Sequence, residues 1–212
     1  MSQIPNVILG IPAGSLNGST LSGNAEIQHT QMRQRVLQTF PVPWTQFRVW
    51  DAWQTNPVGT AASDDLALST GALTASGTAG TINAGDCKNL GATTRRIACF
   101  IPVPDHYDDG ETIQLRVRAA MATTVASTSC TVDAEAFVVG TGATVGSDLV
   151  TTAAQSMNSL TVTDYDFTIN AASVDPGMLL EVRLTIVCSD TATGTAVTPT
   201  IYSVELLCDT RG

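Results

Sequence analysis

Lysine is almost absent from this 212-residue chain: Lys88 stands alone beside nine arginines, and charged residues make up only 14% of the sequence. Globular proteins usually carry about 25% charged residues. Thr, Ser, Ala and Gly fill the places of the missing charges, which favours strands, turns and surfaces that contact other protein. Arginine is less strongly hydrated than lysine and is enriched at protein interfaces. The composition therefore indicates a protein that works packed among others, with compositional drift as the alternative explanation.

Histidine occurs only twice, at His29 and His106. A Ser-His-Asp hydrolase needs a histidine that can carry a proton, and the sequence places His29 in an arm and His106 in a loop. No GxSxG, P-loop or HExxH motif occurs. We therefore expect a protein that is not an enzyme, with no catalytic residues and no cofactor.

The cysteines form no CxxC pair, are odd in number and are widely spaced, so the sequence indicates neither a zinc site nor a dense disulfide framework. They are Cys87, Cys99, Cys130, Cys188 and Cys208. All but Cys87 lie in apolar, strand-like runs. We expect small buried hydrophobic residues in a reducing compartment.

No apolar run approaches the ~20 residues that cross a membrane. The start MSQIPNVILG lacks a charged region followed by a long apolar core, so we expect no secretory signal. The net charge of −9 is unevenly divided, because residues 1–62 carry a net +1 and residues 63–212 carry a net −10. Such an acidic body repels nucleic acid and anionic lipid. We therefore expect no nucleic-acid or membrane partner, whereas the mildly basic arm suits an acidic protein neighbour, including a second copy.

Tryptophan is missing everywhere except in one short segment, where phenylalanines accompany it. A segment too short to bury its own large rings buries them against something else. Three alternatives are open: a clasp onto the protein's own sheet, an anchor in a neighbouring subunit, or a platform on which a ligand stacks. Trp and Arg dominate interface hot spots, so we predict an interface here. Its candidate residues are Phe40, Trp44, Phe47, Trp50, Trp53, Arg33, Arg35 and Arg48.

Residues 1–62 are predicted to form an extended N-terminal arm. Repeated Pro and Gly exclude a helix from residues 1–25. Residues 26–39 are the one helix-compatible stretch, although their apolar face is thin, and Pro41 and Pro43 end it. Residues 63–212 are predicted to form the body.

Strand signals recur through the body, with no amphipathic helix between them. Residues 63–90 are predicted to be loops with one or two edge strands. The stronger predicted strands cover residues 95–103, 112–119, 130–139, 165–169, 179–188 and 201–208, the last with Tyr202, Val204, Leu206 and Cys208 on one face. About eight strands separated by turn signals predict an all-β, antiparallel, jelly-roll-like sandwich.

The densest polar stretch is PDHYDDGE at residues 104–111. Its carboxylates are Asp105, Asp108, Asp109 and Glu111. Oxygen ligands of this kind suit calcium, but their spacing does not match the calcium-loop pattern. We therefore predict a solvated acidic hairpin with no metal, and these four carboxylates are only weak candidates for a cation site.

The body resembles jelly-roll virion proteins of tailed bacteriophages, in particular head decoration (cement) proteins. The resemblance covers roughly residues 95–208 and lies in the strand-and-turn rhythm of IPVPDHYDDGETIQLRVRAAM, TVDAEAFVV, SDLVTTAAQSMNS, DYDFTI and PGMLLEVRLTI. It implies a protein that bridges and stabilises coat subunits on a capsid lattice, commonly as a trimer, and it transfers no catalytic residue.

The expected function is accordingly capsid decoration. The expected partners are the chain itself, as a homotrimer, and the major capsid protein. The expected location is the virion, assembled in the cytoplasm of a bacterial host. The alternatives are a tail- or fibre-associated protein and a carbohydrate- or receptor-binding jelly-roll module.

Overall fold

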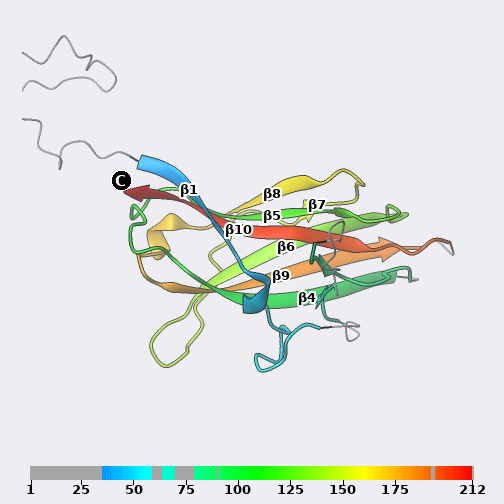
Figure 1. Ribbon diagram of the computed structural model, residues 1–212, viewed down its shortest axis with the longest axis horizontal. Coiled ribbons are helices and arrows are strands. Elements are labelled where there is room, and N and C mark those ends of the chain that lie inside the picture. Colours follow the sequence, from blue (N-terminus) through cyan, green and yellow to red (C-terminus); the bar gives the residue numbers. More distant parts are fainter. Residues whose placement is uncertain (1–34, 59–63, 70–78, 90, 192–193, 212) are drawn as a thin grey trace, which may run out of the picture. The chain divides into compact units, whose positions relative to one another are not determined.

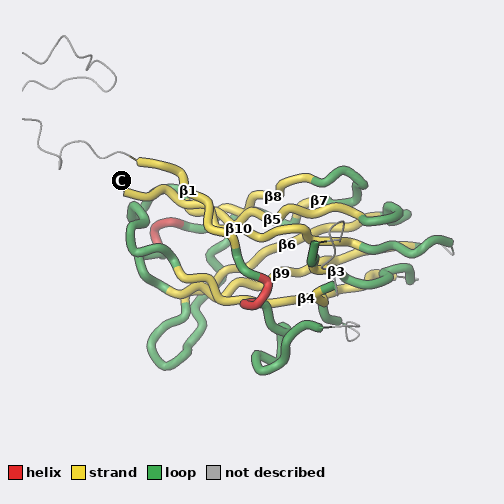
Figure 2. Tube along the Cα trace, in the orientation of Figure 1, coloured by secondary structure: helices red, strands yellow, loops and turns green. Residues whose placement is uncertain are grey.

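A computed structural model describes residues 35–58, 64–69, 79–89, 91–191 and 194–211. The chain divides into two units, residues 1–34 and residues 35–212, and only the second is described below. Its strands are β1 (Arg35–Pro41), β2 (Ala67–Leu68), β3 (Ile82–Asn83), β4 (Gly91–Pro102), β5 (Ile113–Met121), β6 (Ser129–Val138), β7 (Gln155–Ser156), β8 (Thr163–Thr168), β9 (Leu179–Asp190) and β10 (Pro199–Arg211), with short 3-10 helices η2 (Trp44–Gln46) and η3 (Ala171–Ser173). Figure 2 shows that strands and loops make up nearly all of this unit.

The strands form two antiparallel sheets with jelly-roll connectivity. One sheet has the order β2-β3-β10-β5-β8, with β1 also beside β10, and the other has the order β4-β9-β6-β7. The pairs β3–β10, β4–β9, β5–β8 and β6–β7 are nested one inside the next along the chain. This nesting is a long antiparallel hairpin rolled into two layers, which is the jelly-roll arrangement. The predicted fold class is confirmed.

Alternating side chains explain how these strands bury one face. In β5, Ile113, Leu115 and Val117 are buried, whereas Arg116 and Arg118 point outward. Successive side chains of a strand point to opposite faces, so the apolar set of each sheet meets in one shared core. Each fully buried Leu, Ile or Val stabilises the fold by about 1.5–3 kcal/mol relative to leaving it exposed.

The start of β10 departs from simple alternation. The pairing with β5 shifts register between Ile201 and Ser203. Such an irregularity re-aims the neighbouring side chains. As a result Ile201 is fully buried and Tyr202 is only half-buried. The prediction that Tyr202 shares one face with Val204, Leu206 and Cys208 is therefore wrong for Tyr202, whereas the other three are all buried.

The helix-compatible stretch becomes a strand wherever the structure describes it. β1 pairs with β10 from Arg35 opposite Arg211 to Pro41 opposite Glu205. Val36, Thr39 and Phe40 are strand-forming residue types, and β10 supplies a ladder that a thin helical face cannot match. Residues 26–34 lie outside the described part of the chain.

Residues 35–58 belong to the sandwich, although the sequence assigned them to the arm. β1 is part of a sheet, Phe47 is fully buried in the core, and Arg48 exchanges backbone hydrogen bonds of 2.8 and 3.1 Å with Ala98 of β4. The Trp-containing segment therefore packs on the body, and the first 34 residues of the predicted arm lie outside the described residues.

All five cysteines are buried and free, and for all but Cys87 the surrounding apolar runs predict this burial. Cys130 of β6 lies directly opposite Cys188 of β9. Burial raises the pKa of the Cys99 thiol above its usual range and that of Cys208 to about 11, which keeps both protonated. Among the described residues, no helix has the length and apolar character needed to cross a bilayer.

Candidate protein interface

Phe47 anchors the aromatic segment in the core. Pro43 precedes η2, and that single turn brings the ring of Trp44 to 5.6 Å from the ring of Phe47. Phe47 is fully buried, whereas Trp44 is partly buried and packs against the core. The proline-led turn therefore directs one ring inward and lays the other over it.

The other two tryptophans pack on side chains of β4. The rings of Trp53 and Phe100 are stacked 4.2 Å apart at an interplanar angle of 11°. The guanidinium of Arg96 lies 4.9 Å from the centre of the Trp50 ring, a cation–π contact. Trp50 Nε1 is buried without a hydrogen-bond partner among the described residues. Of the three alternatives, these contacts correspond to the clasp onto the protein's own sheet.

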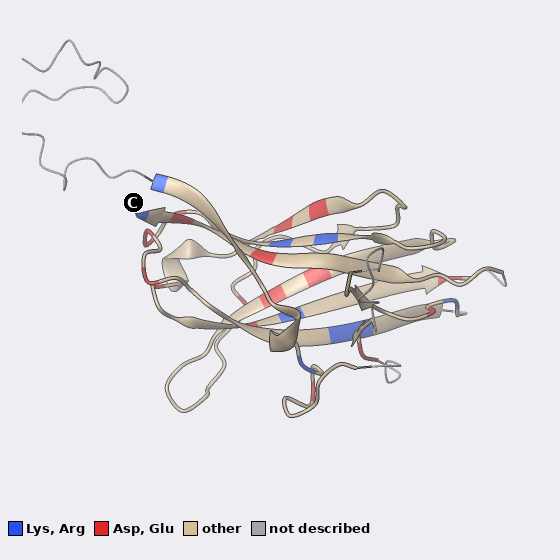
Figure 3. Cartoon of the chain, viewed as in Figure 1, with Lys and Arg blue, Asp and Glu red and all other residues tan. Residues whose placement is uncertain are grey.

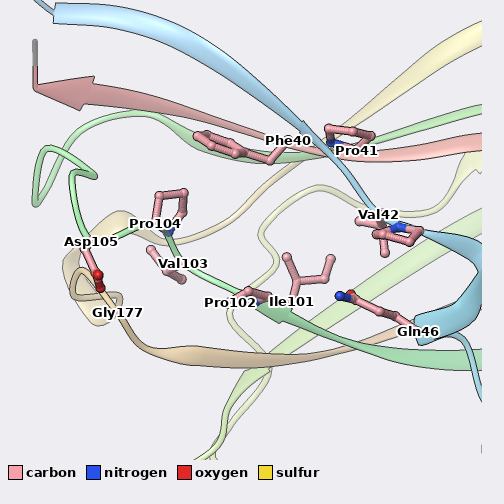
Figure 4. A pocket seen from close by; sticks show the side chains of 11 residues that line it. Phe40, Pro41, Val42, Gln46, Ile101, Pro102, Val103, Pro104, Asp105 and Gly177 are labelled. Atoms are coloured by element: carbon pink, nitrogen blue, oxygen red, sulfur yellow. The ribbon is translucent and has the colours of Figure 1, made fainter.

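A largely apolar cavity of about 510 Å³ lies between the end of β1 and the end of β4 (Figure 4). Phe40, Pro41 and Val42 line one side, and residues 101–105 line the other. In Figure 4 the Asp105 carboxylate lies beside Gly177, and Gln46 reaches in from η2. These two side chains are the main polar groups at a site otherwise made of proline and aliphatic surface.

A second cavity of about 400 Å³ adjoins the Trp53–Phe100 stack. It is lined by Thr45, Gln46, Arg48, Trp53, Phe100, Pro102 and Leu179. An aromatic ring beside hydrogen-bonding side chains is the arrangement that a ligand-stacking platform requires. However, Arg48 already donates from Nη1 to the carbonyl oxygens of Thr45 and Phe47, both at 2.7 Å.

One carboxylate of the acidic loop binds the start of β1 and the end of β10, which lie side by side. Asp108 is only 1% exposed and accepts hydrogen bonds from Arg35 Nε at 2.9 Å and Arg211 Nε at 2.7 Å. Arg35 Nη2 also lies 2.6 Å from Glu111 Oε1. We call this set the Asp108 clamp.

The Asp108 clamp involves two of the four carboxylates that were weak candidates for a cation site. Asp108 and Glu111 face arginines, while Asp105 and Asp109 are exposed. Within the described ranges, no group of His, Cys, Asp and Glu side chains is arranged to hold a metal ion. The predicted solvated hairpin is therefore wrong for Asp108, because its carboxylate is buried between two guanidinium groups.

Of the neighbouring loop residues, Tyr107 stabilises the loop itself and His106 contacts β1. Tyr107 is fully buried and donates its hydroxyl to the Glu111 carbonyl at 2.7 Å. Burial, followed by nearby acidic charge, raises the pKa of Tyr107 to about 12. His106 Nε2 lies 3.2 Å from Gln38 Oε1, and its ring packs edge-on against Phe40 at 5.9 Å.

The outer face of β5 and β8 carries ion pairs that the sequence analysis did not identify. Arg116 binds Asp166 through two bonds of 2.7 and 2.8 Å, and Arg118 binds Asp164 through bonds of 2.7 and 3.0 Å. Figure 3 shows basic positions on β5 beside acidic positions on β8. Two arginines in RVR and two aspartates in DYD have the same spacing, which could have indicated ion pairs between two strands. The sequence does not show which strands are neighbours or in which register they pair.

The outer face of β6 and β9 is partly covered and acidic. The Arg183 guanidinium lies 4.4 Å from the centre of the Phe137 ring, which explains why that outward ring is only 8% exposed. Burial raises the pKa values of Asp133 and Glu135, and the charge of Asp148 adds to both shifts.

β1 is an exposed strand, and it carries two of the predicted interface residues. Six of its seven residues are exposed, including Val36 at 47% and Leu37 at 53%. Of the predicted set, Phe40 and Arg35 lie on β1, and Arg33 lies outside the described residues. The remaining members, Trp44, Phe47, Arg48, Trp50 and Trp53, pack against this chain's own sandwich or bond within the segment.

Comparison with known proteins yields structural matches only, because no family model and no curated protein matches the chain. The xylan-binding module CBM15 shares 15% identity, with a TM-score of 0.41 over 84% of this chain and 100% of that one. A structure of the infectious bursal disease virus Gx strain shares 13% identity, with a TM-score of 0.39 over 84% of this chain and 34% of that one. The CBM22-1 xylan-binding domain of Paenibacillus barcinonensis Xyn10C shares 9% identity, with a TM-score of 0.38 over 69% and 81%. Similarities this low carry no argument about function.

Proposed function

We propose that this chain is a non-enzymatic virion structural protein of a tailed bacteriophage, which decorates the capsid and stabilises neighbouring coat subunits. The observation that carries the proposal is β1, an exposed strand with apolar side chains that directly follows residues 1–34. A decorating protein has to add buried area between neighbours. We propose that the exposed strand, together with the 34 residues that precede it in the chain, supplies that area.

The way the rigid body holds β1 supports this role. The Asp108 clamp fastens β1 to the end of β10, and the contacts of His106 with Gln38 and Phe40 hold its middle. Because β1 is fixed to the sandwich, a neighbour that binds β1 is held by the whole folded body. A specific interface buries about 1,600 Å² in total, which one seven-residue strand does not supply alone, so residues 1–34 are part of the proposed contact.

The proposed partners are further copies of the chain and the major capsid protein, and the proposed location is the virion. The low content of charged residues, 14%, suits surfaces that remain packed against protein. The strongly acidic body makes direct contact with packaged nucleic acid unfavourable.

Sedimentation with phage heads tests this proposal. Full-length protein is mixed with undecorated heads of the tailed phage, and the pelleted protein is quantified against the coat subunit. We expect saturable binding at a fixed ratio to the coat subunit and a higher melting temperature of the heads. Protein that stays in the supernatant at every concentration, while the heads pellet, would contradict the proposal.

A carbohydrate-binding module is the second candidate, favoured by one observation. The Trp53–Phe100 stack borders a cavity of about 400 Å³ with Gln46 and Arg48 on its wall. A glycan screen followed by Trp fluorescence tests it. Trp53→Ala should abolish the fluorescence change and the binding if this candidate is correct, and it should leave head binding unchanged if the first is correct.

A further inference from the structure

The outer edge of β1 is the one long strand edge that the described part of the chain leaves open. Open edges are templates for pairing with another strand, and natural proteins usually cover them. The edge of β4 is covered in its middle, because Arg48 bonds to Ala98 and Leu66 bonds to Arg96. The edge of β8 is covered by Thr151, Thr152 and Gln155, and the edge of β2 by Pro57.

The register of β1 fixes which backbone groups face outward. Val42 N–H donates to Val204 C=O at 2.9 Å, so the even-numbered residues of β1 bond to β10. Inward and outward groups alternate along an antiparallel strand. The N–H and C=O groups of Leu37 and Thr39 therefore point away from β10, and no backbone hydrogen bond to them exists within the described ranges.

We propose that a second copy of this chain binds this edge, so that two β1 strands pair antiparallel around a two-fold axis through Gln38. This inference goes beyond capsid decoration, because it specifies how one copy meets another, and its two-fold pair differs from the homotrimer that the resemblance implies. The register of this pairing follows from which backbone N–H and C=O groups of β1 point away from β10. Leu37 of each copy exchanges backbone hydrogen bonds with Thr39 of the other, and the N–H of Arg35 donates to the C=O of Pro41.

The side chains of β1 are compatible with this self-pairing. Val36 lies opposite Phe40, which places two apolar side chains together, and Gln38 lies opposite its own copy. Arg35 lies opposite Pro41, so no like charges meet across the axis, where they would be destabilising. Pro41 has no N–H, but it falls at the end of the ladder, where only one bond per copy is lost. Charged residues, proline and bulges are the usual devices that block edge pairing. β1 has no bulge, and its charged residue and its proline, Arg35 and Pro41, are confined to its two ends.

A second copy is the proposed occupant because β1 is compatible with itself about a two-fold axis. An isologous contact requires one surface to complement itself, and the sequence RVLQTFP does so in the one register that uses all seven residues. Exposed Val36 and Leu37 then become covered in both copies at once.

A disulfide trap at the axis tests the proposal directly. Gln38 would face its copy at a non-hydrogen-bonded position, where Cα atoms lie about 4.5 Å apart, within the range that a disulfide bridges. Full-length Gln38→Cys should therefore form a covalent dimer under mild oxidation. Thr163→Cys, at an exposed position of β8, is the matched control and should remain monomeric on a non-reducing gel. The five native cysteines are buried and do not compete.

Thr39→Pro is the complementary non-covalent test. It removes an outward N–H from each copy while leaving the bonds to β10 intact. We expect self-association, measured by light scattering on a sizing column, to weaken by more than tenfold. Thr39→Val keeps the N–H and should associate like the parent protein, and unchanged circular dichroism shows that each variant is folded.

Two outcomes would overturn the proposal. In the first, full-length protein is monomeric at every concentration and Gln38→Cys cross-links no more than Thr163→Cys, so that residues 1–34 or another partner cover the edge. In the second, a stable oligomer forms that neither Thr39→Pro nor the disulfide trap affects, so that copies meet elsewhere. A dimer that fails to pellet with phage heads would keep this inference and reject capsid decoration.

Discussion

At the scale of single residues, Phe47 decides whether the aromatic segment is part of the core. Phe47→Ala should lower the free energy of unfolding by about 3–5 kcal/mol, because it leaves a cavity among fully buried side chains. Urea denaturation followed by circular dichroism measures this change. Val58→Ala, at a position that is 70% exposed, is the control and should change stability by less than about 0.5 kcal/mol. Equal, small effects of both substitutions would mean that the segment does not pack as described.

Asp108 is the second residue whose substitution tests the structure, because its carboxylate binds two arginines. Asp108→Asn keeps the size of the side chain but removes the charge that holds Arg35 and Arg211. We expect a loss of about 2 kcal/mol, since hydrogen bonds to charged groups contribute about 1.5–3 kcal/mol and both arginines are half-exposed.

The adjacent aspartate is a matched control for this substitution. Asp109 is exposed, so Asp109→Asn should leave the urea midpoint almost unchanged. If both substitutions cost the same, the contribution of Asp108 comes from the general charge of the loop and not from the clamp.

These residues also mark how far the sequence alone can lead. Clustered rings without enough chain around them correctly indicated burial against something else. Their partners, Phe100 and Arg96, belong to a strand far along the chain, and only the fold brings them to Trp53 and Trp50. In the same way, the acidic composition of residues 104–111 was visible. The arginines that neutralise Asp108, Arg35 and Arg211, are far apart in the sequence, and only the pairing of β1 with β10 brings them together.

At the scale of elements, strands buried on one face were predictable, and edge strands were not. β5 and β9 alternate because one face meets the core and the other meets solvent. β1 has almost no buried side chain, so it leaves no alternating pattern to read. Its strand conformation comes from the β10 ladder, which is a tertiary effect. The bulge that turns Tyr202 outward is likewise set by pairing and not by periodicity.

The outer faces of the two sheets carry acids whose pKa values move in opposite directions. Burial raises the pKa of Glu135 above its ordinary value of 4.5, so ionising it opposes folding. The stability that the folded state has with Glu135 protonated is fully present below pH 4.5, and it is lost as the pH rises through the folded-state pKa of Glu135. Glu135→Gln should therefore be more stable than the parent at pH 7, and the difference should vanish near pH 4. Urea midpoints measured across this range give the test.

Asp164 supplies a comparison of opposite sign. The hydrogen bond from Arg118 lowers the pKa of Asp164 below its ordinary value of 3.8. Its contribution is present above pH 3.8 and is lost as the pH falls through the folded-state pKa. Asp164→Asn should be less stable than the parent at pH 7 and should approach it in stability in strong acid. If the urea midpoints of both variants and of the parent changed with pH in parallel, the explanation given for Glu135 and Asp164 would be wrong.

At the scale of the whole molecule, the position of the boundary between arm and body determines what a truncation does. The sequence placed that boundary after residue 62, whereas β1, Phe47 and the bonds of Arg48 to β4 make residues 35–58 part of the sandwich. The difference arises because proline, glycine and unpaired aromatic rings suggest an arm when no partner strand is visible. An arm and an edge strand have the same local sequence character, and only long-range pairing separates them.

Two truncations therefore should behave differently. Removing residues 1–34 should leave the sandwich folded, with the urea midpoint of the full chain, and should weaken binding to phage heads, because it takes away only the segment before β1. Removing residues 1–60 should unfold or aggregate the remainder, because it exposes the side of β10 that β1 covers and deletes Phe47 from the core. Sizing chromatography and thermal melting of both proteins measure these outcomes. A stable, monomeric protein lacking residues 1–60 would restore the boundary near residue 62 and make β1 an appendage, whereas instability of the protein lacking residues 1–34 would extend the folded unit toward the N-terminus.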